Sequence, residues 1–418
     1  MSKLVVKGRK PLRGEVTVGG SKNSSVAIVP AALLGEGTSS LENLPRIDDV
    51  RVFAQILKDL GVTVDANSTT MEVTPNGFRS HVAPYELVRK LRASYYLMGV
   101  LLAKFGRAEV GLPGGCDIGP RPIDQHLKGF RAMGSEVAVE GGVVKLYAPN
   151  GLKGANIYLD IPSVGATINI MLAATHAEGT TIIENAAKEP HVVDLANFLN
   201  AMGARVLGAG TDVVRVRGGR KMTGTFHSVI PDDMEAATYM MAAVGTGGDV
   251  LLKNVITKHL EPVTAKLREA GALIDENADY IHVVGPRRPK PLNVKTLPYP
   301  GFPTDAQQPL VSVLALADGV SVVQESVYEN RLGFVGELVK MGGRIKVEGK
   351  TAIVEGVKRL VGAPVKVNDL RAGAALVLAG LSAYGTSEVY GLDIVQRGYE
   401  IIDEKLAALG ADVKVTEG

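Results

Sequence analysis

Two kinds of apolar segment alternate along the chain, and each kind recurs six times. Segments of the first kind are apolar nearly all round a helix, which predicts buried helices at 26–34, 95–103, 168–177, 236–244, 311–317 and 374–381. Those of the second kind are amphipathic, as at 192–202, and carry charges that predict an outer position. Short strand-like stretches separate them. The pattern therefore predicts a β-β-α-β-α-β unit repeated about six times.

Glycine marks equivalent points of these units and accounts for 49 of the 418 residues. Three series run in phase, and each has one member per unit: Gly61, Gly134, Gly203, Gly271, Gly342 and Gly410; Gly37, Gly106, Gly179, Gly247, Gly319 and Gly385; Gly8, Gly77, Gly151, Gly218, Gly285 and Gly356. A helix end or a tight turn needs a positive φ, which glycine adopts without steric cost. We therefore expect positive φ angles at these positions.

The repeat predicts more than one hydrophobic core. Single cores stop growing near about 250–300 residues, so six units favour two globes of three units with a cleft between them. The repeat alone does not show at which residues the chain passes from one domain to the other.

Composition and charge exclude several classes of function. Lysine and arginine exceed aspartate and glutamate by 46 − 44 = 2, so no global field favours nucleic acid or an anionic membrane. No run of 18 apolar residues exists, and the N-terminus lacks a secretory signal, which together predict a cytoplasmic protein. A single cysteine excludes an internal disulfide, and the seven histidines lack metal-ligand spacing, so no metal is expected.

Cations stand where three of the predicted buried helices begin, namely Lys22, Arg92 and Arg371. Helix N-termini favour anions, so this pattern predicts a site for phosphate or carboxylate groups. The aspartates at two equivalent turns, Asp232 and Asp369, are expected to cap their helices instead.

A glycine- and proline-rich loop carries the one cysteine. Cys116 follows two glycines and precedes Asp117 and Arg121, which indicates an exposed thiol in a positive setting. A lone cysteine is more often a small buried side chain, and that alternative stays open here.

Several stretches resemble the UDP-N-acetylglucosamine 1-carboxyvinyltransferases, members of the enolpyruvyl transferase family that open bacterial peptidoglycan synthesis. The resemblance covers the whole chain. It is carried by 19–23 (GGSKN), 91–94 (LRAS), 113–124 (PGGCDIGPRPID), 162–167 (PSVGAT), 301–307 (GFPTDAQ), 329–331 (ENR), 369–372 (DLRA) and 397–400 (RGYE). Two positions depart from the family pattern, Leu332-Gly333-Phe334 and Gln396.

The resemblance implies an α/β fold, a two-domain inside-out α/β barrel of six βαβαββ repeats with three per domain. It implies a discontinuous domain at 1–21 plus 230–418, an inserted domain at 22–229 that carries the Cys116 loop, and an active site in the interdomain cleft. The implied partners are phosphoenolpyruvate and UDP-N-acetylglucosamine, with no cofactor, no nucleic acid and no membrane.

The resemblance also implies roles for single residues. Those for phosphoenolpyruvate are Lys22, Asn23, Arg121, Arg371 and Arg397. Those for the UDP-sugar are Arg92, Arg121, Pro122, Ile123, Asp124, Ser163, Val164, Asp305 and Val327. Arg331 and Asp369 are expected to support them. In an addition–elimination reaction, we expect Cys116 to act as acid and Asp305 as base, with Lys22 and Arg397 also catalytic.

Two alternatives remain open at this stage. One is enolpyruvyl transfer to shikimate 3-phosphate, since that enzyme shares the architecture and the lysine of the first turn. The other is a catalytically silent UDP-sugar-binding relative, against which the presence of Lys22, Cys116, Asp305 and Arg397 argues.

Overall fold

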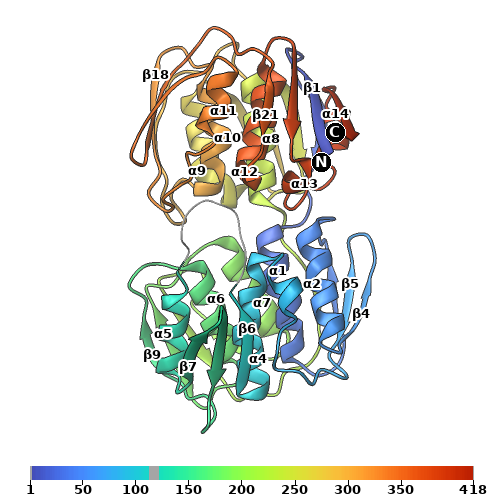
Figure 1. Ribbon diagram of the computed structural model, residues 1–418, viewed down its shortest axis with the longest axis vertical. Helices are drawn as coiled ribbons and strands as arrows, with labels where there is room; N and C mark the ends of the chain where they lie inside the picture. Colours follow the sequence, from blue (N-terminus) through green and yellow to red (C-terminus); the bar gives the residue numbers. More distant parts are fainter. Residues whose placement is uncertain (1, 113–121, 418) are drawn as a thin grey trace. The chain divides into compact units, whose positions relative to one another are not determined.

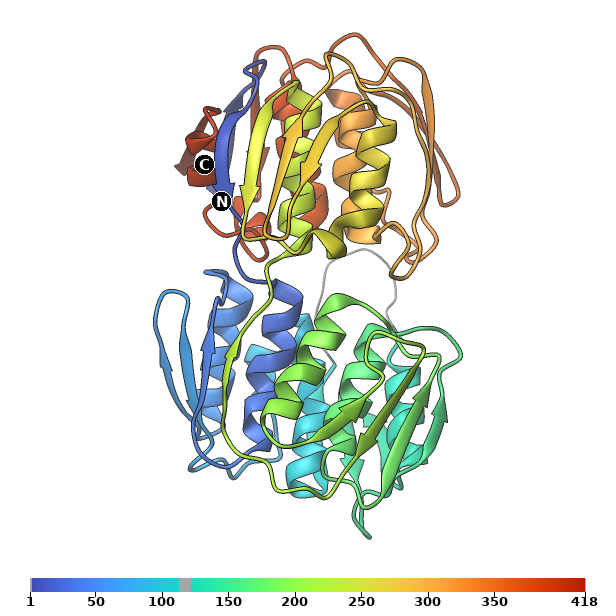
Figure 2. The same ribbon diagram turned by 180° about the vertical axis from the view of Figure 1, so that it is seen from behind.

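In the computed structural model the described residues are 2–112 and 122–417, and they group into two units (Figures 1 and 2). We name 2–19 with 231–417 the discontinuous unit, and 20–112 with 122–230 the inserted unit. The described chain passes between the units at 19–20 and at 230–231. The division expected from the sequence lay at 21–22 and 229–230.

Five of the six sheets in the described part of the chain follow one plan. A strand at one edge runs parallel to its neighbour, the third strand is antiparallel to the second, and the fourth is antiparallel to the third. In β17-β18-β20-β19, for example, Val294 pairs with Val323, and Val323 pairs with Ala352. This repeated topology confirms the six-unit pattern.

The discontinuous unit holds three such sheets. They are β21 (Pro364–Lys366), β22 (Thr386–Tyr390), β1 (Ser2–Lys7) and β23 (Asp412–Glu417); β15 (Leu273–Glu276), β16 (Tyr280–Val284), β14 (Asp249–Lys253) and β2 (Arg13–Thr17); and β17 (Asn293–Lys295), β18 (Val320–Gln324), β20 (Thr351–Glu355) and β19 (Arg344–Glu348). The inner helices are α8 (Asp233–Thr246), α10 (Thr304–Leu314) and α12 (Leu370–Ser382). The others are α9 (Thr257–Glu269), α11 (Val335–Lys340), α13 (Leu392–Val395) and α14 (Ile402–Ala408).

The inserted unit repeats the arrangement. Its sheets are β13 (Phe226–Ser228), β3 (Ser39–Glu42), β5 (Met71–Thr74) and β4 (Thr63–Ala66); β11 (Arg205–Leu207), β12 (Val213–Arg217), β10 (Thr180–Glu184) and β9 (Asn156–Tyr158); and β6 (Arg107–Gly111), β8 (Val143–Tyr147) and β7 (Glu136–Glu140). The last sheet has three strands, and a parallel bridge between Val82 and Glu109 stands where the others have their edge strand.

The helices of the inserted unit also fall into two groups. The inner ones are α1 (Lys22–Ala31) with η1 (Ala32–Leu34), η2 (Arg92–Tyr96) with α4 (Leu97–Phe105), and α6 (Val164–Ala174). The others are α2 (Asp48–Asp59), α3 (Tyr85–Val88), α5 (Asp124–Ala132) and α7 (Pro190–Ala201).

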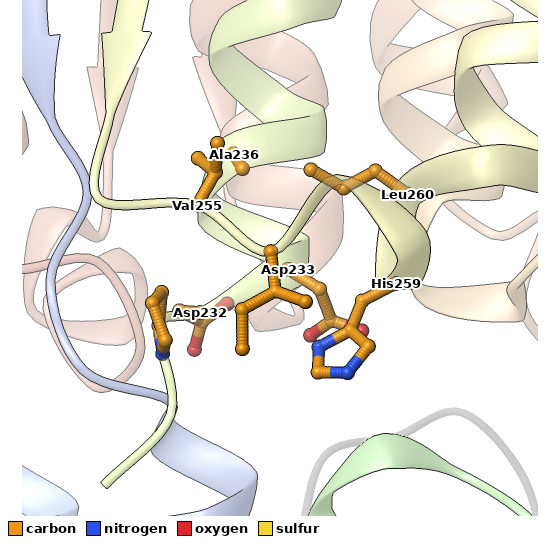
Figure 3. Close-up of a pocket in the computed structure, with 8 residues that line it drawn as sticks. Asp232, Asp233, Ala236, Val255, His259 and Leu260 are labelled. Atoms are coloured by element: carbon orange, nitrogen blue, oxygen red, sulfur yellow. The ribbon is translucent and has the colours of Figure 1, made fainter. Parts of the chain in front are cut away.

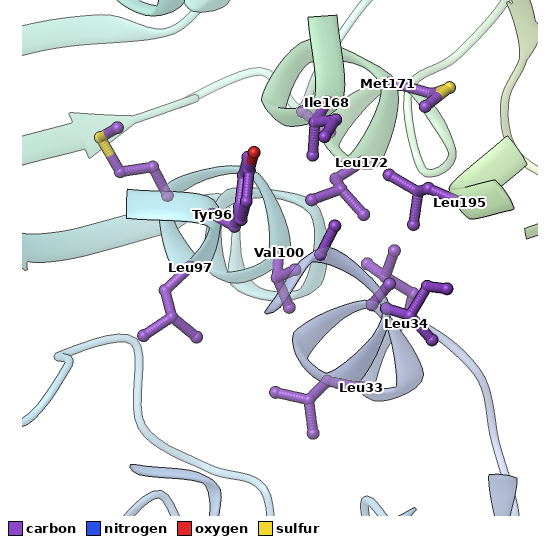
Figure 4. Close-up of a cluster of buried hydrophobic side chains, with 14 of the residues drawn as sticks. Leu33, Leu34, Tyr96, Leu97, Val100, Ile168, Met171, Leu172 and Leu195 are labelled. Atoms are coloured by element: carbon purple, nitrogen blue, oxygen red, sulfur yellow. The ribbon is translucent and has the colours of Figure 1, made fainter. Parts of the chain in front are cut away.

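In each unit the inner helices form the core and the sheets lie outside them (Figure 1). Figure 4 shows Leu34, Val100 and Leu172 meeting between three inner helices of the inserted unit. Since sheets cover these helices, their apolar residues are buried all round, as predicted. Several inner helices begin earlier than the apolar pattern suggested, since their polar first turns belong to the helix.

The amphipathic helices mostly bury one face, as predicted. In α9, for instance, Leu260, Val263 and Leu267 are buried and the remaining face carries the charges. Helix α7 is the exception to the expected outer position, because most of its residues are buried. It packs on α1, and its Asp194 accepts a hydrogen bond from Ser24 Oγ at 2.6 Å.

Two of the three glycine series have the expected backbone. All members of the Gly61 and Gly37 series have positive φ, for example 106° at Gly203 and 96° at Gly179. The prediction of a positive φ is wrong for four members of the third series, Gly8, Gly218, Gly285 and Gly356. A Cβ at Gly356 would lie 1.9 Å from Ala317 O, and Gly8, Gly218 and Gly285 have similar close contacts. Close backbone approach therefore requires glycine there.

We expect Gly356→Ala to lower the free energy of unfolding by about 1–3 kcal/mol or more, because a methyl group would overlap the backbone of 317. Gly336→Ala is the matched control. A Cβ at Gly336 would have no atom within 4 Å, so alanine in α11 should raise stability by up to about 1 kcal/mol. Urea unfolding of both variants measures this, and equal changes would contradict the steric explanation.

Candidate active site

The inner helices begin with polar turns, and most of the predicted site residues lie there. Ser21, Ser163, Asp232 and Asp369 cap α1, α6, α8 and α12. Asp232 Oδ1 accepts from Glu235 N at 2.8 Å, and Asp369 Oδ1 accepts from Arg371 N at 2.9 Å. The capping role expected for these two aspartates is confirmed.

Two arginines hold Asp305 in the first turn of α10. Arg331 Nη2 donates to Asp305 Oδ1 at 2.8 Å, and Arg371 Nε donates to Oδ2 at 3.1 Å. Arg371 Nη2 forms an ion pair with the same oxygen at 3.1 Å. Both guanidinium groups are buried, with 3% of each side chain exposed, whereas Asp305 is 29% exposed. Each oxygen of the Asp305 carboxylate therefore contacts a buried cation.

A buried amide and the capping aspartate complete this cluster. Gln308 Nε2 donates to Asp369 Oδ2 and to Arg331 O, both at 2.9 Å, and Gln308 Oε1 accepts from Arg331 Nε at 3.4 Å. Asp369 thus caps α12 and fixes the side chain that orients Arg331. Asp305, Arg331, Asp369 and Arg371 lie together in the discontinuous unit, as the supporting roles of Arg331 and Asp369 require.

The cluster keeps both arginines charged. Burial by itself lowers the pKa of Arg331, but Asp305 and Asp369 outweigh burial and leave its pKa raised. Burial also lowers the pKa of Arg371, while Tyr399 and Asp305 raise it, again with a net increase. Arg371 Nη1 is buried and makes no hydrogen bond with any residue that the structure describes. Arg371 thus places a buried positive charge at the start of α12.

Val327 lies in a loop held by one buried carboxylate. Glu325 Oε1 accepts from Val327 N at 2.7 Å and from Thr296 Oγ1 at 3.0 Å. Its other oxygen accepts from Thr304 Oγ1 at 2.9 Å, next to Asp305. Glu325 therefore joins the Val327 loop to the start of α10, a role that no sequence motif indicated.

The two positions that depart from the family pattern, 332–334 and 396, include buried and half-buried side chains. Leu332 and Phe334 are both buried, so this loop packs through an aromatic residue at 334. Gln396 and Arg397 are half-buried directly after α13. Nearby, the ring centroid of Tyr399 lies 5.2 Å from Arg371 Cζ, and its hydroxyl lies 2.9 Å from Thr238 Oγ1.

A small pocket lies at the start of α8. Asp233 and Ala236 of α8 line it together with the N-cap Asp232, and His259 and Leu260 of α9 line it together with Val255 from the preceding segment (Figure 3). Burial, then the charge of Asp232, raise the pKa of Asp233 to about 7. Asp233 is therefore an acid that titrates near neutral pH, and the sequence did not single it out.

Asp233 should make the protein less stable as pH rises from about 4 to about 7. Its carboxyl binds a proton more tightly in the folded than in the unfolded state, so the folded state holds more protons in this window. The slope for one proton is up to about 1.4 kcal/mol per pH unit. Asp233→Asn should remove this loss and gain stability relative to wild type most clearly above pH 7.

Urea unfolding between pH 4 and 8 measures the effect of Asp233→Asn. Asp279→Asn serves as the control, since Asp279 is exposed in the same unit and should leave the profile unchanged. Parallel profiles for wild type and Asp233→Asn would contradict the raised pKa.

In the inserted unit, Lys22 and Asn23 open α1 and are half-buried. Lys22 Nζ forms an ion pair with Asp49 Oδ2 at 3.2 Å, with 16% of the lysine and 5% of the aspartate side chain exposed. Asp49 lies in the first turn of α2. The pair of aspartates at 48–49 is the one sequence signal that could have indicated a partner for Lys22.

The residues expected to bind the UDP-sugar come from three helix starts of the inserted unit. Arg92 opens η2, Pro122 and Ile123 precede Asp124 at the start of α5, and Ser163 precedes Val164 at the start of α6. Charges of Asp124 and Arg92 both act on the buried His126, so these two starts lie near one another. Cys116 and Arg121 lie outside the described residues.

The whole chain matches known proteins. A family model described as EPSP synthase (3-phosphoshikimate 1-carboxyvinyltransferase) matches residues 6–406. A relative from Caldanaerobacter subterraneus, named UDP-N-acetylglucosamine 1-carboxyvinyltransferase 3, is 54% identical over 99% of both chains. The chain belongs to the UDP-N-acetylglucosamine 1-carboxyvinyltransferase family of enolpyruvyl transferases.

Solved enolpyruvyl transferases share the fold. The enolpyruvyl transferase NikO from Streptomyces tendae aligns with a TM-score of 0.90 at 26% identity, over 100% of this chain and 99% of that one. An EPSP synthase from Acinetobacter baumannii aligns with a TM-score of 0.80 at 22% identity over the full length of both, a likeness of fold alone. These likenesses confirm the inside-out α/β architecture.

The described part of this enolpyruvyl transferase has neither a helix suited to span a membrane nor a cluster of side chains suited to a metal ion. Among its helices, none combines the length and apolar character needed to cross a bilayer. Within 2–112 and 122–417, no group of three or more histidine, cysteine, aspartate or glutamate side chains is placed to hold a metal ion.

Proposed function

We propose that this enzyme transfers the enolpyruvyl group of phosphoenolpyruvate to the 3′-hydroxyl of UDP-N-acetylglucosamine and releases phosphate. The reaction is the first committed step of peptidoglycan biosynthesis, and we place it in the cytoplasm. The observation that carries the proposal is the 54% identity, over 99% of both chains, to a relative with that name. The likeness to the EPSP synthase structure is 22% identical and extends to the fold alone.

The binding roles follow from charge. Phosphoenolpyruvate carries a carboxylate and a phosphate, so it needs several cations in a small space. Lys22 with Asn23 from the inserted unit and Arg371 with Arg397 from the discontinuous unit would supply them, together with Arg121. The buried positive charge of Arg371 supports this role. The proposed roles therefore draw on residues of both units.

The UDP-sugar would bind against the inserted unit. Arg92, Arg121 and the 122–124 segment would contact its charged and polar groups, with Ser163 and Val164 opposite. Asp305 and Val327 would complete the site from the discontinuous unit, where Glu325 already joins their segments.

The chemistry is an addition followed by an elimination. Asp305 removes the proton from the 3′-hydroxyl, whose oxygen attacks C2 of phosphoenolpyruvate while Cys116 protonates C3. Phosphate then leaves from the tetrahedral intermediate, and a proton returns from C3 to the enzyme. An acid and a base each contribute about 10²–10⁴-fold.

Phosphate release tests the proposal. Wild-type enzyme should release phosphate from phosphoenolpyruvate when UDP-N-acetylglucosamine is added, and none above background with shikimate 3-phosphate. Release with shikimate 3-phosphate alone would replace the proposal by the shikimate-pathway reaction. No release with either acceptor would indicate a binding protein without catalytic activity.

The acid role of Cys116 predicts different outcomes for two substitutions. Cys116→Asp retains a titratable acid and should keep appreciable turnover, whereas Cys116→Ser should be slower by about tenfold or more, because a serine hydroxyl is far too weak an acid. Steady-state kcat of both variants measures this. Equal turnover would remove the acid role from Cys116.

A further inference from the structure

Three separate segments of the inserted unit carry the residues that we propose for UDP-sugar binding: the start of η2 with Arg92, the start of α5 with Asp124, and the start of α6 with Ser163 and Val164. They are distant in sequence, so something must fix their mutual positions. Two polar side chains buried behind them, Asn169 and His126, have no part in the mechanism above.

Asn169 connects these segments with both of its amide N–H donors and one acceptor position of its oxygen. Its Oδ1 accepts from Gly99 N at 2.9 Å, and its Nδ2 donates to Tyr95 O at 3.0 Å and to His126 Nδ1 at 2.9 Å. The side chain is fully buried on α6. One amide therefore joins η2 and α4 on one side, and α5 on the other, to α6.

His126 completes the connection as a neutral ring. Because the Asn169 amide nitrogen donates, His126 Nδ1 must accept, and the ring proton lies on Nε2. Burial lowers the pKa of His126 to about 3, so the acceptor is present at every physiological pH. The ring centroid lies 5.1 Å from that of Tyr95 of η2, in an edge-on arrangement.

The first turn of α6 rests directly on this ring. A Cβ at Gly165 would lie 2.8 Å from both Nε2 and Cε1 of His126, so only glycine lets the helix approach so closely. Gly165 immediately follows Val164. The position of the imidazole therefore sets the position of the α6 start.

A second bridge lies next to the first. Gln125 Oε1 accepts from Asp160 N at 2.9 Å, and its Nε2 donates to Asp160 Oδ2 at 2.9 Å and to Asp124 Oδ2 at 2.7 Å. It joins the start of α5 to the segment that leads into Ser163. The two bridges are independent contacts between the same pair of segments.

We propose that Asn169 and His126 are positioning residues for the UDP-sugar: they hold the starts of η2, α5 and α6 at the spacing that the nucleotide sugar requires. The inference rests on the proposed function, since it takes UDP-N-acetylglucosamine as the ligand. Neither side chain needs to contact the ligand for this role.

Titration calorimetry with UDP-N-acetylglucosamine and steady-state kinetics test the inference. His126→Leu leaves the Asn169 amide unpaired and should raise Kd and KM for the UDP-sugar by about tenfold, with KM for phosphoenolpyruvate within about twofold of wild type. His126→Asn can place Oδ1 where Nδ1 was and should recover most of the affinity. A structural role alone would not divide the two KM values in this way.

His176→Leu is the matched control. His176 follows the other end of α6, where its Nδ1 lies 2.8 Å from Thr175 Oγ1, and burial lowers its pKa to about 4. It should leave the Kd for UDP-N-acetylglucosamine unchanged. Should His126→Leu fail to fold, Gly165→Ala presses a methyl group on the same ring and should raise Kd similarly.

The outcomes separate the inference from the proposed function. Wild-type enzyme that does not bind UDP-N-acetylglucosamine would overturn the proposed function itself. Wild-type binding with unchanged Kd in His126→Leu, or in Gly165→Ala where His126→Leu does not fold, would overturn the positioning role. An equal loss in His176→Leu would overturn it too.

Discussion

Asp305→Asn is expected to lower kcat by about 10²–10⁴-fold, because it removes the group that takes the proton from the attacking hydroxyl. The amide keeps the size of the side chain and can still accept a hydrogen bond from Arg331 or Arg371, so the substrates should still bind. Initial rates of phosphate release, with KM for each substrate measured separately, give the result.

Asp318→Asn provides the control for the same chemical change. Asp318 lies just beyond the other end of α10, where its exposed carboxylate pairs with Arg288 at 2.7 Å. Its amide variant should retain wild-type kcat. If Asp305→Asn also kept kcat within about tenfold, Asp305 would not be the base.

The repeat could be predicted from the sequence because its signals are local. A positive φ at Gly203 and the all-round apolar character of α6 depend on a few neighbouring residues. The caps at Asp232 and Asp369 are local as well, since each bonds to a backbone amide within three residues. Such local features recur in each of the six repeats, so each occurrence supports the interpretation of the others.

Contacts between elements that are separate in the sequence could not be predicted in the same way. The Lys22–Asp49 ion pair, the Glu325 bridge and the Asn169–His126 pair all join separate elements of a unit. Periodicity gives the order of the elements along the chain but not which helix starts meet. Those pairings require the three-dimensional arrangement of each unit.

A buried network of charged side chains lies next to Gly19, where the chain passes from the discontinuous to the inserted unit. Sequence patterns could not predict this network either. Lys405 Nζ lies 2.7 Å from Glu235 Oε1 and 3.0 Å from Glu400 Oε1, and Gly19 N donates to Glu235 Oε2 at 2.7 Å. Burial raises the pKa of Glu235 to about 7 although Lys405 opposes it. These residues are distant in sequence, yet together they hold the last residue before the chain enters the inserted unit.

Arg371→Leu is expected to lower both stability and phosphoenolpyruvate affinity. Its removal leaves Asp305, which is 29% exposed, paired with Arg331 alone, and the lost charge-assisted hydrogen bond should cost about 1.5–3 kcal/mol of unfolding free energy. It also removes a positive charge that we propose for phosphoenolpyruvate binding. We expect kcat/KM for phosphoenolpyruvate to fall by about 10³-fold, mostly through KM, since a charge-assisted contact to the substrate is lost.

Arg331→Leu separates the two effects. Arg331 is equally buried and bonds to the other oxygen of Asp305, so its loss should destabilise the protein by a similar amount. The donors of Arg331 that form hydrogen bonds are directed at Asp305 and Gln308, and it has no proposed contact with phosphoenolpyruvate. This variant should therefore lower kcat by misplacing Asp305, with KM for phosphoenolpyruvate changed much less. If both variants raised that KM equally, Arg371 would serve only to hold Asp305, and another cation would have to bind the phosphoenolpyruvate anion in its place.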